Sequence, residues 1–303
     1  MTELSQAIFD NYQIRKSRKQ KDRFIALMQT HFPEMTVQEG GFPKNKNLIL
    51  GDVQEAEVVL TAHYDTCARL PFPNLITPKN IFIYLLYSIA IIIPYVLLGI
   101  GLNILVHLIT SNIIINYLIS LIFYLIVLYV LFAGPANRHT ANDNTSGVIT
   151  LCEIYQAMTP VQRSKTAIAF FDNEELGILG SGYFRSVYKK EMKQKLLINY
   201  DCVSDGDYIM IGISKKARPK YGSNFTESFT ATGSKHILLE KAEKLLYPSD
   251  QSNFKCTAAV AALNKNKIFG YYMSRIHTVK DTIFDTENIE LLKECTLSFV
   301  DRL

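Results

Sequence analysis

The sequence predicts an α/β fold, a central sheet flanked by helices, with an apolar two-helix hairpin inserted into it. Three observations support this prediction. Short apolar β-type runs alternate with longer stretches of helical periodicity along the chain. Several of these runs end directly in histidine or carboxylate residues, as strands do at the functional edge of open α/β sheets. Between them lies one long segment without a single charged side chain.

Composition and charge narrow the class of protein. With 303 residues and 48% hydrophobic content, the chain can build one large domain or two smaller ones. The net charge of +4 arises from 32 basic and 28 acidic residues. The one basic run, Arg15 to Lys21, is interpreted as a solvated helix face, so we expect no nucleic-acid partner. The five cysteines are widely spaced and include no Cys-x-x-Cys pair, so we expect reduced thiols. The first residues do not resemble a signal peptide, and both observations predict that most of the protein lies in the cytosol.

The first part of the chain reads as helix followed by strands. Apolar residues at helical spacing predict an amphipathic helix, broken once, from about Ser5 to His31. Two short strands follow, around 35–37 and 47–50, with a turn signal at Gly40-Gly41-Phe42-Pro43 between them. A buried strand over 57–62 then leads straight into His63.

The segment 80–137 contains no Asp, Glu, Lys or Arg and consists mainly of Ile, Leu, Tyr, Val and Phe. A membrane-spanning helix needs ~20 apolar residues, so the segment is too long for one span and fits two. We expect these spans at roughly Ile81–Val106 and Ile113–Phe132, joined by a turn at 107–112. Pro94 lies inside the first span, where membrane helices tolerate proline better than soluble ones do. A buried soluble hairpin would show a polar face, and none is visible.

Both ends of such a hairpin must return to the same side of the membrane. Lys79 and Arg138 flank the uncharged segment, all 32 basic residues lie outside it, and its tip carries no charge. The positive-inside rule therefore predicts an integral membrane protein of the cell membrane whose termini and folded domain are cytosolic. We expect a discontinuous domain formed by residues 1–78 and 135–303, with residues 79–134 as a transmembrane helical hairpin insertion.

The remaining elements alternate between strand and helix. A helix is expected after residue 147, a strand over 166–171 with a helix after the Glu174-Glu175 turn, and a strand over 195–200. Further along, β-type character appears at 208–213 and 268–272, with helices expected at about 233–246 and 287–300.

Three places along the chain offer side chains suited to metal chemistry. His63 and Asp65 follow a strand and stand two residues apart, so they project to the same side and the carboxylate can orient the imidazole. Glu174 and Glu175 lie at a turn, where one carboxylate can bind a metal while its neighbour accepts a proton from a bound water. Asp143 stands just before a helix, either as its N-cap or as a carboxylate that bridges two metal ions.

Two further residues share this design, because Asp201 ends a β-type run and His277 follows another. Together the chain offers two nitrogen and three carboxylate ligands. Such a set can hold two zinc ions if one carboxylate is shared between them. The predicted metal ligands are His63, Asp143, Glu175, Asp201 and His277.

These segments resemble the motifs of the M28 family of co-catalytic zinc peptidases, which includes bacterial aminopeptidases. The similarity lies in His63-Tyr64-Asp65, Ala141 to Val148, Phe171 to Ser181, Asp201, Ser249 to Phe254 and Ile276 to Thr282. Together these motifs span nearly the whole chain apart from the apolar insert. The resemblance implies a mixed central sheet like that of zinc aminopeptidases, two Zn²⁺ ions per chain, and hydrolysis of peptide bonds.

The resemblance also implies the role of each residue. Glu174 would be the general base towards a metal-activated water, and Asp65 would steady His63. Asp143 would bridge the two ions, and the peptide bond that follows it would be cis. One histidine and one carboxylate would complete each metal site: His63 with Asp201, and His277 with Glu175.

Two departures from the family pattern concern substrate choice. A long insert separates Asp65 from Asp143, where family members need only a short connection. Gln251 stands where members often have His, and Ile276 stands where many have Tyr. The ligand set survives these changes, and Tyr271 or Tyr272 is a candidate replacement for the missing phenol.

The main expectation is a membrane-tethered di-zinc metallopeptidase, most specifically an aminopeptidase, whose partners are the lipid bilayer and a peptide. The hairpin leaves the folded domain and returns to it close to the predicted site. We therefore expect the substrates to be peptides delivered at the membrane. Two alternatives stay open. The first is a glutaminyl-cyclase-like acyl transferase. Such enzymes typically use one zinc, so the presence of both His63 and Asp201 argues against this alternative. A non-enzymatic membrane receptor or scaffold on this fold would be expected to have lost ligands or the base.

Overall fold

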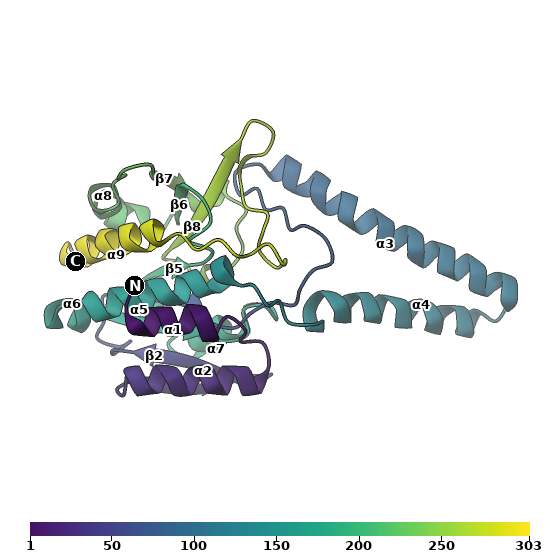
Figure 1. Cartoon of the computed structure of the whole chain (residues 1–303), viewed down its shortest axis with the longest axis horizontal. Helices are drawn as coiled ribbons and strands as arrows, with labels where there is room; N and C mark the ends of the chain where they lie inside the picture. The colour runs from purple at the N-terminus through teal and green to yellow at the C-terminus, as the bar shows by residue number, and fades with distance from the viewer.

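A mixed nine-stranded sheet lies between helices in the computed structural model, which describes residues 1–303, and a helical hairpin projects from one end of this body (Figure 1). The predicted fold class is therefore confirmed. The strand order is β1-β2-β4-β3-β5-β8-β6-β7, and β9 pairs with β8. The strands are β1 (Thr36–Gly40), β2 (Asn45–Leu50), β3 (Val58–His63), β4 (Thr166–Phe171), β5 (Leu196–Tyr200), β6 (Tyr208–Ile213), β7 (His236–Lys241), β8 (Thr257–Asn266) and β9 (Gly270–Tyr272).

The centre of the sheet is parallel. β3 pairs in parallel with both β4 and β5, and β5 pairs in parallel with β8, whereas β2 and β6 run antiparallel to their neighbours β4 and β8. Every residue of β3, β4 and β5 is buried, which explains their continuous apolar sequences. The carboxyl ends of these three strands consequently lie side by side at one edge of the sheet.

Helices cover both faces of the sheet. Leu60 of β3 packs with residues of α1, α2, α5 and α9 on one face, whereas its neighbour Val59 packs towards Phe184 of α7 on the other, because successive side chains of a strand point to opposite faces. The helices of the body are α1 (Glu3–Asn11), α2 (Arg18–His31), α5 (Gly147–Ala157), α6 (Pro160–Lys165), α7 (Leu179–Val187), α8 (Arg218–Ser228) and α9 (Thr286–Asp301).

Three elements differ from the sequence-based prediction. The helix expected at about 233–246 does not form, and residues 236–241 are strand β7. Main-chain pairing with β6 outweighs the helical spacing of the apolar residues in this segment. The central strand β8 was not predicted, since its alanine-rich start has low β propensity and is stabilised by burial between β5 and β6. Helix α8 was not predicted either.

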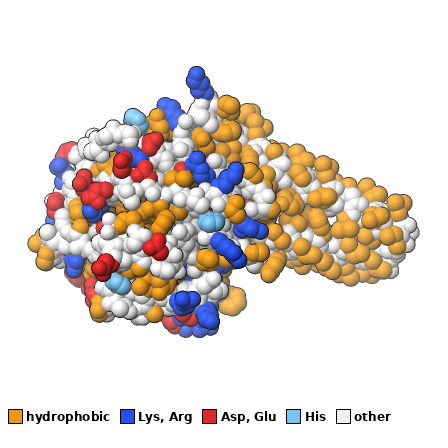
Figure 2. All heavy atoms as spheres, viewed as in Figure 1, with side chains coloured by type: hydrophobic (Ala, Val, Ile, Leu, Met, Phe, Trp, Pro, Cys, Tyr) orange, Lys and Arg blue, Asp and Glu red, His pale blue; other side chains and the backbone are white.

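The hairpin consists of α3 (Ile81–Ile109) and α4 (Ile113–Leu128), which continues as a π-helical turn over Tyr129–Ala133. Both helices are long and apolar enough to cross a membrane, by length and composition, and α3 extends over about 43 Å at ~1.5 Å per residue. The connecting turn is shorter than predicted, because α3 continues to Ile109. Figure 2 shows a hydrophobic hairpin surface without acidic or basic side chains.

The two hairpin helices contact each other through small and polar residues. A side chain at Gly99 would collide with the ring of Tyr124, so this glycine allows the helices to approach closely. Nearby, the Asn103 amide donates a hydrogen bond to Ser120 Oγ at 2.9 Å. Such contacts are typical of helices that associate inside a membrane.

The root of the hairpin is bonded to the loops at the carboxyl edge of the sheet. The Leu70 N–H donates to the His277 carbonyl at 2.8 Å, and the Leu246 N–H donates to the Pro78 carbonyl at 2.9 Å. Ile76 forms an antiparallel bridge with Met273. The hairpin therefore originates at the same edge as the predicted functional residues.

Candidate metal centre

Strand ends bring the predicted site residues together. His63 is the last residue of β3, Asp201 follows β5, and Glu174 and Glu175 follow β4 within a tight turn. Asp143 arrives from the irregular turn Ala141–Ser146 that precedes α5, and this stretch is fully buried. His277 lies in the loop after β9 and adopts a left-handed backbone conformation with φ of 60°.

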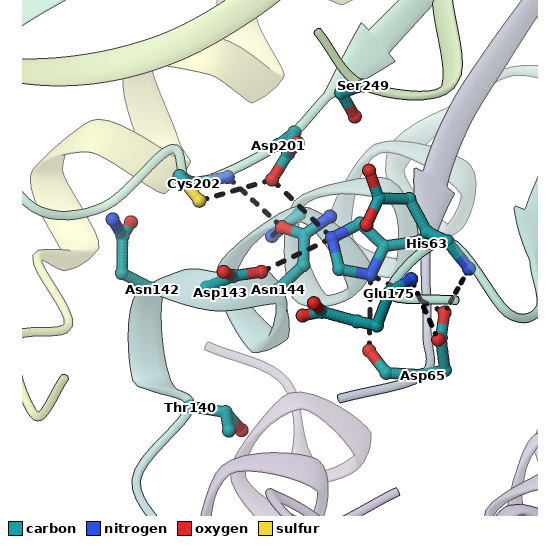
Figure 3. A network of polar contacts seen from close by, with 12 residues as sticks. His63, Asp65, Thr140, Asn142, Asp143, Asn144, Glu175, Asp201, Cys202 and Ser249 are labelled. Carbon is teal, nitrogen blue, oxygen red and sulfur yellow. Dashed lines mark hydrogen bonds and ion pairs between the residues drawn. The ribbon is translucent and has the colours of Figure 1, made fainter. Parts of the chain in front are cut away.

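Asp143 directs its two carboxylate oxygens to two different histidines. Its Oδ1 lies 3.3 Å from Nε2 of His63, and its Oδ2 lies 2.9 Å from Nε2 of His277. Each histidine also faces a second carboxylate at 3.5 Å, Asp201 for His63 and Glu175 for His277. Figure 3 shows Asp143 and Asp201 converging on the His63 ring. The five predicted ligands thus form two clusters that share one carboxylate.

The His63 ring is oriented for ligation through Nε2. Its Nδ1 lies 3.1 Å from the main-chain carbonyl of Asp65, and a carbonyl oxygen can only accept, so Nδ1 carries the proton. In the neutral ring Nε2 then presents a lone pair towards Asp143 and Asp201. Three electron-pair donors converge there, and a cation among them satisfies all three.

Asp65 fixes the turn that carries the two glutamates. Its Oδ1 accepts the N–H of Glu174 at 3.0 Å and its Oδ2 accepts the N–H of Glu175 at 3.2 Å. The same Oδ1 lies 3.6 Å from His63 Nδ1, which is too long for a hydrogen bond. The Asp65 carbonyl therefore holds the imidazole, in place of the carboxylate expected from the sequence, and the carboxylate positions Glu174 and Glu175.

A second acidic residue fixes the Asp143 turn. Asp281 accepts the N–H of Asn142 at 2.8 Å and the N–H of Asp143 at 3.1 Å. The Asn144 amide donates to the Tyr200 carbonyl at 3.0 Å, which ties the turn to the end of β5. The peptide bond between Asp143 and Asn144 is cis, as expected from the family resemblance. This role of Asp281 was not predicted, although the residue lies within the segment Ile276 to Thr282 that carries the family resemblance.

The donor set has an excess of negative charge that divalent cations would balance. Oε1 of Glu175 and both carboxylate oxygens of Asp250 are buried without a hydrogen-bond partner. Burial raises the pKa of Glu175 to about 8 and that of Asp250 to about 7. Burial likewise raises the pKa of Glu174 well above its ordinary value, with Glu175 and Asp250 adding to the effect. The residues present therefore fit a pair of zinc-class cations.

A cavity of about 250 Å³ opens onto these residues. All five predicted ligands and Glu174 line it, and Asp65 lies behind them. Cys202, after β5, also lines it, and its remaining walls are largely apolar and come from two regions. The first region is the segment before α3 and the first turn of α3, which contribute Asn74, Ile76 and Tyr84. The second consists of the loops after β7 and β9, which contribute Leu246, Tyr247, Pro248 and Ile276.

The interpretation of the basic run Arg15 to Lys21 as a solvated face holds only in part, because Arg18 and Lys19 are exposed whereas Arg15 and Lys21 are not. Arg15 is completely buried, and it donates to the Tyr64 carbonyl at 2.5 Å and to Thr145 Oγ1 at 3.2 Å. Lys21 donates to the side chains of Asp172 and Asn173, next to the glutamate turn. Helical periodicity could not reveal these roles, because the partners lie far along the chain.

The two side chains that depart from the family pattern are Gln251 and Ile276, of which Ile276 lines the cavity. Gln251 accepts a hydrogen bond from the Asn199 amide at 2.9 Å and donates to the Tyr247 carbonyl at 2.7 Å, so it braces a wall of the cavity. Tyr271 and Tyr272, the predicted replacements for a phenol at Ile276, do not line the cavity. Two other tyrosines do, Tyr84 and Tyr247, of which Tyr247 donates its hydroxyl to the Asp201 carbonyl.

Comparison with known proteins gives a family and several similar folds. A sequence model described as peptidase family M28 matches residues 128–300. A Zn-dependent exopeptidase from Parabacteroides distasonis is similar over 98% of this chain and 97% of its own, with 14% identity and a TM-score of 0.59. The aminopeptidase LapA from Legionella pneumophila is similar over 98% of this chain and 69% of its own, with 11% identity and a TM-score of 0.56.

A glutaminyl cyclase from Porphyromonas gingivalis is equally similar in fold, over 99% of this chain and 96% of its own, with 16% identity and a TM-score of 0.57. No curated protein sequence matches the chain. The structural likenesses establish the fold, and at these identities they do not separate one activity from another.

Proposed function

Because the chain belongs to peptidase family M28, we propose that it is a membrane-tethered zinc metallopeptidase, most specifically an aminopeptidase, that uses two zinc ions. The observation that carries this proposal is the placement of Asp143, whose two oxygens lie 3.3 Å and 2.9 Å from two separate histidines. A carboxylate shared in this way fits a pair of ions held close together. His63 and Asp201 would complete one site, and His277 and Glu175 the other.

When bound, the two ions supply Lewis-acid activation of the scissile carbonyl and of the attacking water. Glu174 lies beside the ligands and lines the same cavity, so it is the group that accepts the proton from the water and delivers it to the leaving amine. Asp65 positions Glu174 through the main-chain hydrogen bond at 3.0 Å.

The two alternative functions make different demands on these residues. A glutaminyl-cyclase-like acyl transferase on this fold would need one zinc, whereas this chain places one carboxylate between two histidines, each of which faces a further carboxylate. A non-enzymatic receptor or scaffold would not need Glu174 to line the cavity beside a full ligand set. Both observations favour the peptidase.

We expect good substrates to require a free α-amino group, as the resemblance to aminopeptidases implies. The purified protein would be assayed on matched peptides with free and acetylated N-termini and on a peptide with N-terminal glutamine, and its bound metal would be counted. Release of the first residue from the free peptide alone, at two metals per chain, supports the aminopeptidase. Equal cleavage of both N-termini contradicts it, and cyclisation of the glutaminyl peptide without hydrolysis would select the cyclase.

For the membrane, we propose that residues 1–78 and 135–303 form a cytosolic catalytic domain and that 79–134 cross the bilayer twice. The length of α3 and α4 and their exposed apolar surfaces support this arrangement. Leu108 and Ile113, at the hairpin tip, are 78% and 81% exposed in the chain by itself. Such a surface is costly in water and favourable in lipid.

The position of Tyr84 links the membrane to the substrate. This residue lies in the first turn of α3, yet it lines the same cavity as His63 and Glu174. In the proposed arrangement the cavity would open where α3 enters the bilayer, and a bound peptide would contact α3 itself. We propose that the enzyme trims apolar peptides delivered at the membrane surface in preference to bulk cytosolic peptides.

Substituting Tyr84→Ala should lower kcat/KM about tenfold for peptides with a bulky apolar first residue, since it removes part of an apolar pocket wall. Peptides that begin with alanine should be affected little, and Tyr84→Phe should behave like the wild type. The matched control is Phe82→Ala, in the same turn of α3, whose side chain is 68% exposed and lies outside the cavity. Equal losses for both classes of peptide would rule out a specificity role, and loss of kcat in Tyr84→Phe would show that the hydroxyl acts in catalysis.

A further inference from the structure

We propose that a cleft beside the root of α3 binds the phosphate headgroup of an anionic phospholipid, an inference that rests on the proposed membrane placement. The cleft has a volume of about 630 Å³. It lies between residues 69–73, which lead towards α3, and residues 274–280, the loop that carries His277. Three cationic side chains line it, Arg69, Arg275 and Lys280, and no Asp or Glu does.

The cations of the cleft are available to a ligand. Arg69 and Lys280 are exposed, and neither side chain forms an ion pair or hydrogen bond within the chain. Arg275 uses Nη1 to contact both oxygens of Asp205, at 2.7 Å and 2.8 Å, which leaves Nε and Nη2 free. The buried Asp205 therefore neutralises one of the three positive charges, and the two that remain can bind the single negative charge of a phosphodiester from both walls of the cleft.

The apolar part of the cleft favours a lipid over a soluble phosphate compound. Leu70, Phe72 and Val279 line it together with the cations. The Phe72 ring lies 6.3 Å from the ring of Tyr95, well along α3, so this wall continues onto the hydrophobic hairpin. Figure 2 shows Lys and Arg side chains gathered where the body meets the hairpin. A phospholipid at the membrane surface carries a phosphate group next to its acyl chains, so it fits a cleft that has cationic and apolar walls side by side.

Lipid in the cleft would also act on the metal centre. The Leu70 N–H donates to the His277 carbonyl at 2.8 Å, so the two walls of the cleft are joined at a predicted ligand. On the other wall, Thr278 Oγ1 donates to the Arg275 carbonyl at 2.6 Å, which shapes the turn around His277. A headgroup that contacts both walls would hold this loop in place, so anionic lipid should increase peptide hydrolysis.

Native mass spectrometry of the full-length protein in detergent, titrated with phosphatidylglycerol or phosphatidylcholine, tests the proposal. The wild type should retain phosphatidylglycerol in preference to phosphatidylcholine. The double variant Arg69→Gln, Lys280→Gln should bind phosphatidylglycerol roughly 25-fold more weakly, since each basic residue at an anionic surface contributes about fivefold. The matched control is Lys190→Gln, Lys193→Gln, which removes two exposed charges near the amino ends of β3 and β5, the opposite edge of the sheet, and should keep the preference.

Equal retention of the two lipids by the wild type, or an unchanged preference in the double variant, would overturn the proposal. Displacement of the lipid by inorganic phosphate at comparable concentration would assign the cleft to free phosphate and overturn it as well. Carbonate extraction of cell membranes tests the underlying placement. Release of the protein by carbonate refutes the placement, whereas a membrane-retained, active peptidase without headgroup preference refutes only the cleft.

Discussion

Glu174→Gln is expected to lower turnover roughly a thousandfold while leaving the protein folded, because it removes a general base and keeps a side chain of the same size. The Glu174 side chain belongs to neither of the two clusters that share Asp143, so bound metal should remain at two per chain. Peptide hydrolysis, metal content by mass spectrometry and thermal unfolding are measured on the same preparation.

Glu287→Gln is a suitable control, since it makes the same change in the first turn of α9, away from the cavity. Its turnover should equal that of the wild type. Near-normal hydrolysis by Glu174→Gln would refute the assigned base. Loss of metal together with activity would instead place Glu174 among the ligands.

Asp143→Ala should be still more damaging, because this carboxylate faces both histidine clusters. Its removal leaves one histidine and one carboxylate on each side, and the two cations would then lie close together without a shared anion between them. We expect metal content to fall from two per chain towards none and hydrolysis to be lost.

Glu175→Ala is the matched comparison, since the one histidine within 4.0 Å of the Glu175 carboxylate is His277, whereas Asp143 contacts both histidines. This variant should retain about one metal per chain, held by the His63 cluster. If Asp143→Ala kept two metals per chain, Asp143 would not be the bridge. If both variants lost the same amount of metal, the two clusters would not be separate sites.

Much of the site could be predicted because its residues follow strands. His63, Glu175 and Asp201 each come after a buried apolar run, and parallel strands bring their carboxyl ends to one edge, so residues distant in sequence become neighbours. The two long apolar helices of the hairpin could be predicted from composition alone, since the segment between Lys79 and Arg138 carries no charge and is long enough for two of them. These features depend on local pattern, and a sequence displays local pattern directly.

Other features depend on partners that no local pattern identifies. The strand β8 is alanine-rich and owes its conformation to burial between β5 and β6. The helix expected around β7 did not form, because pairing along the sheet edge satisfied its main chain. In both cases the tertiary environment outweighed a weak intrinsic preference.

The residue types of the site, their order along the chain and the hairpin next to them are all visible in the amino-acid sequence. The contacts among them arise on folding: Asp143 divides its oxygens between two histidines, the Asp65 carboxylate holds the glutamate turn, and Tyr84 of α3 lines the cavity. The two kinds of feature differ in the sequence distance over which they act. Periodicity and propensity act over a few residues, whereas these contacts join segments brought together only when the sheet and the hairpin root are packed.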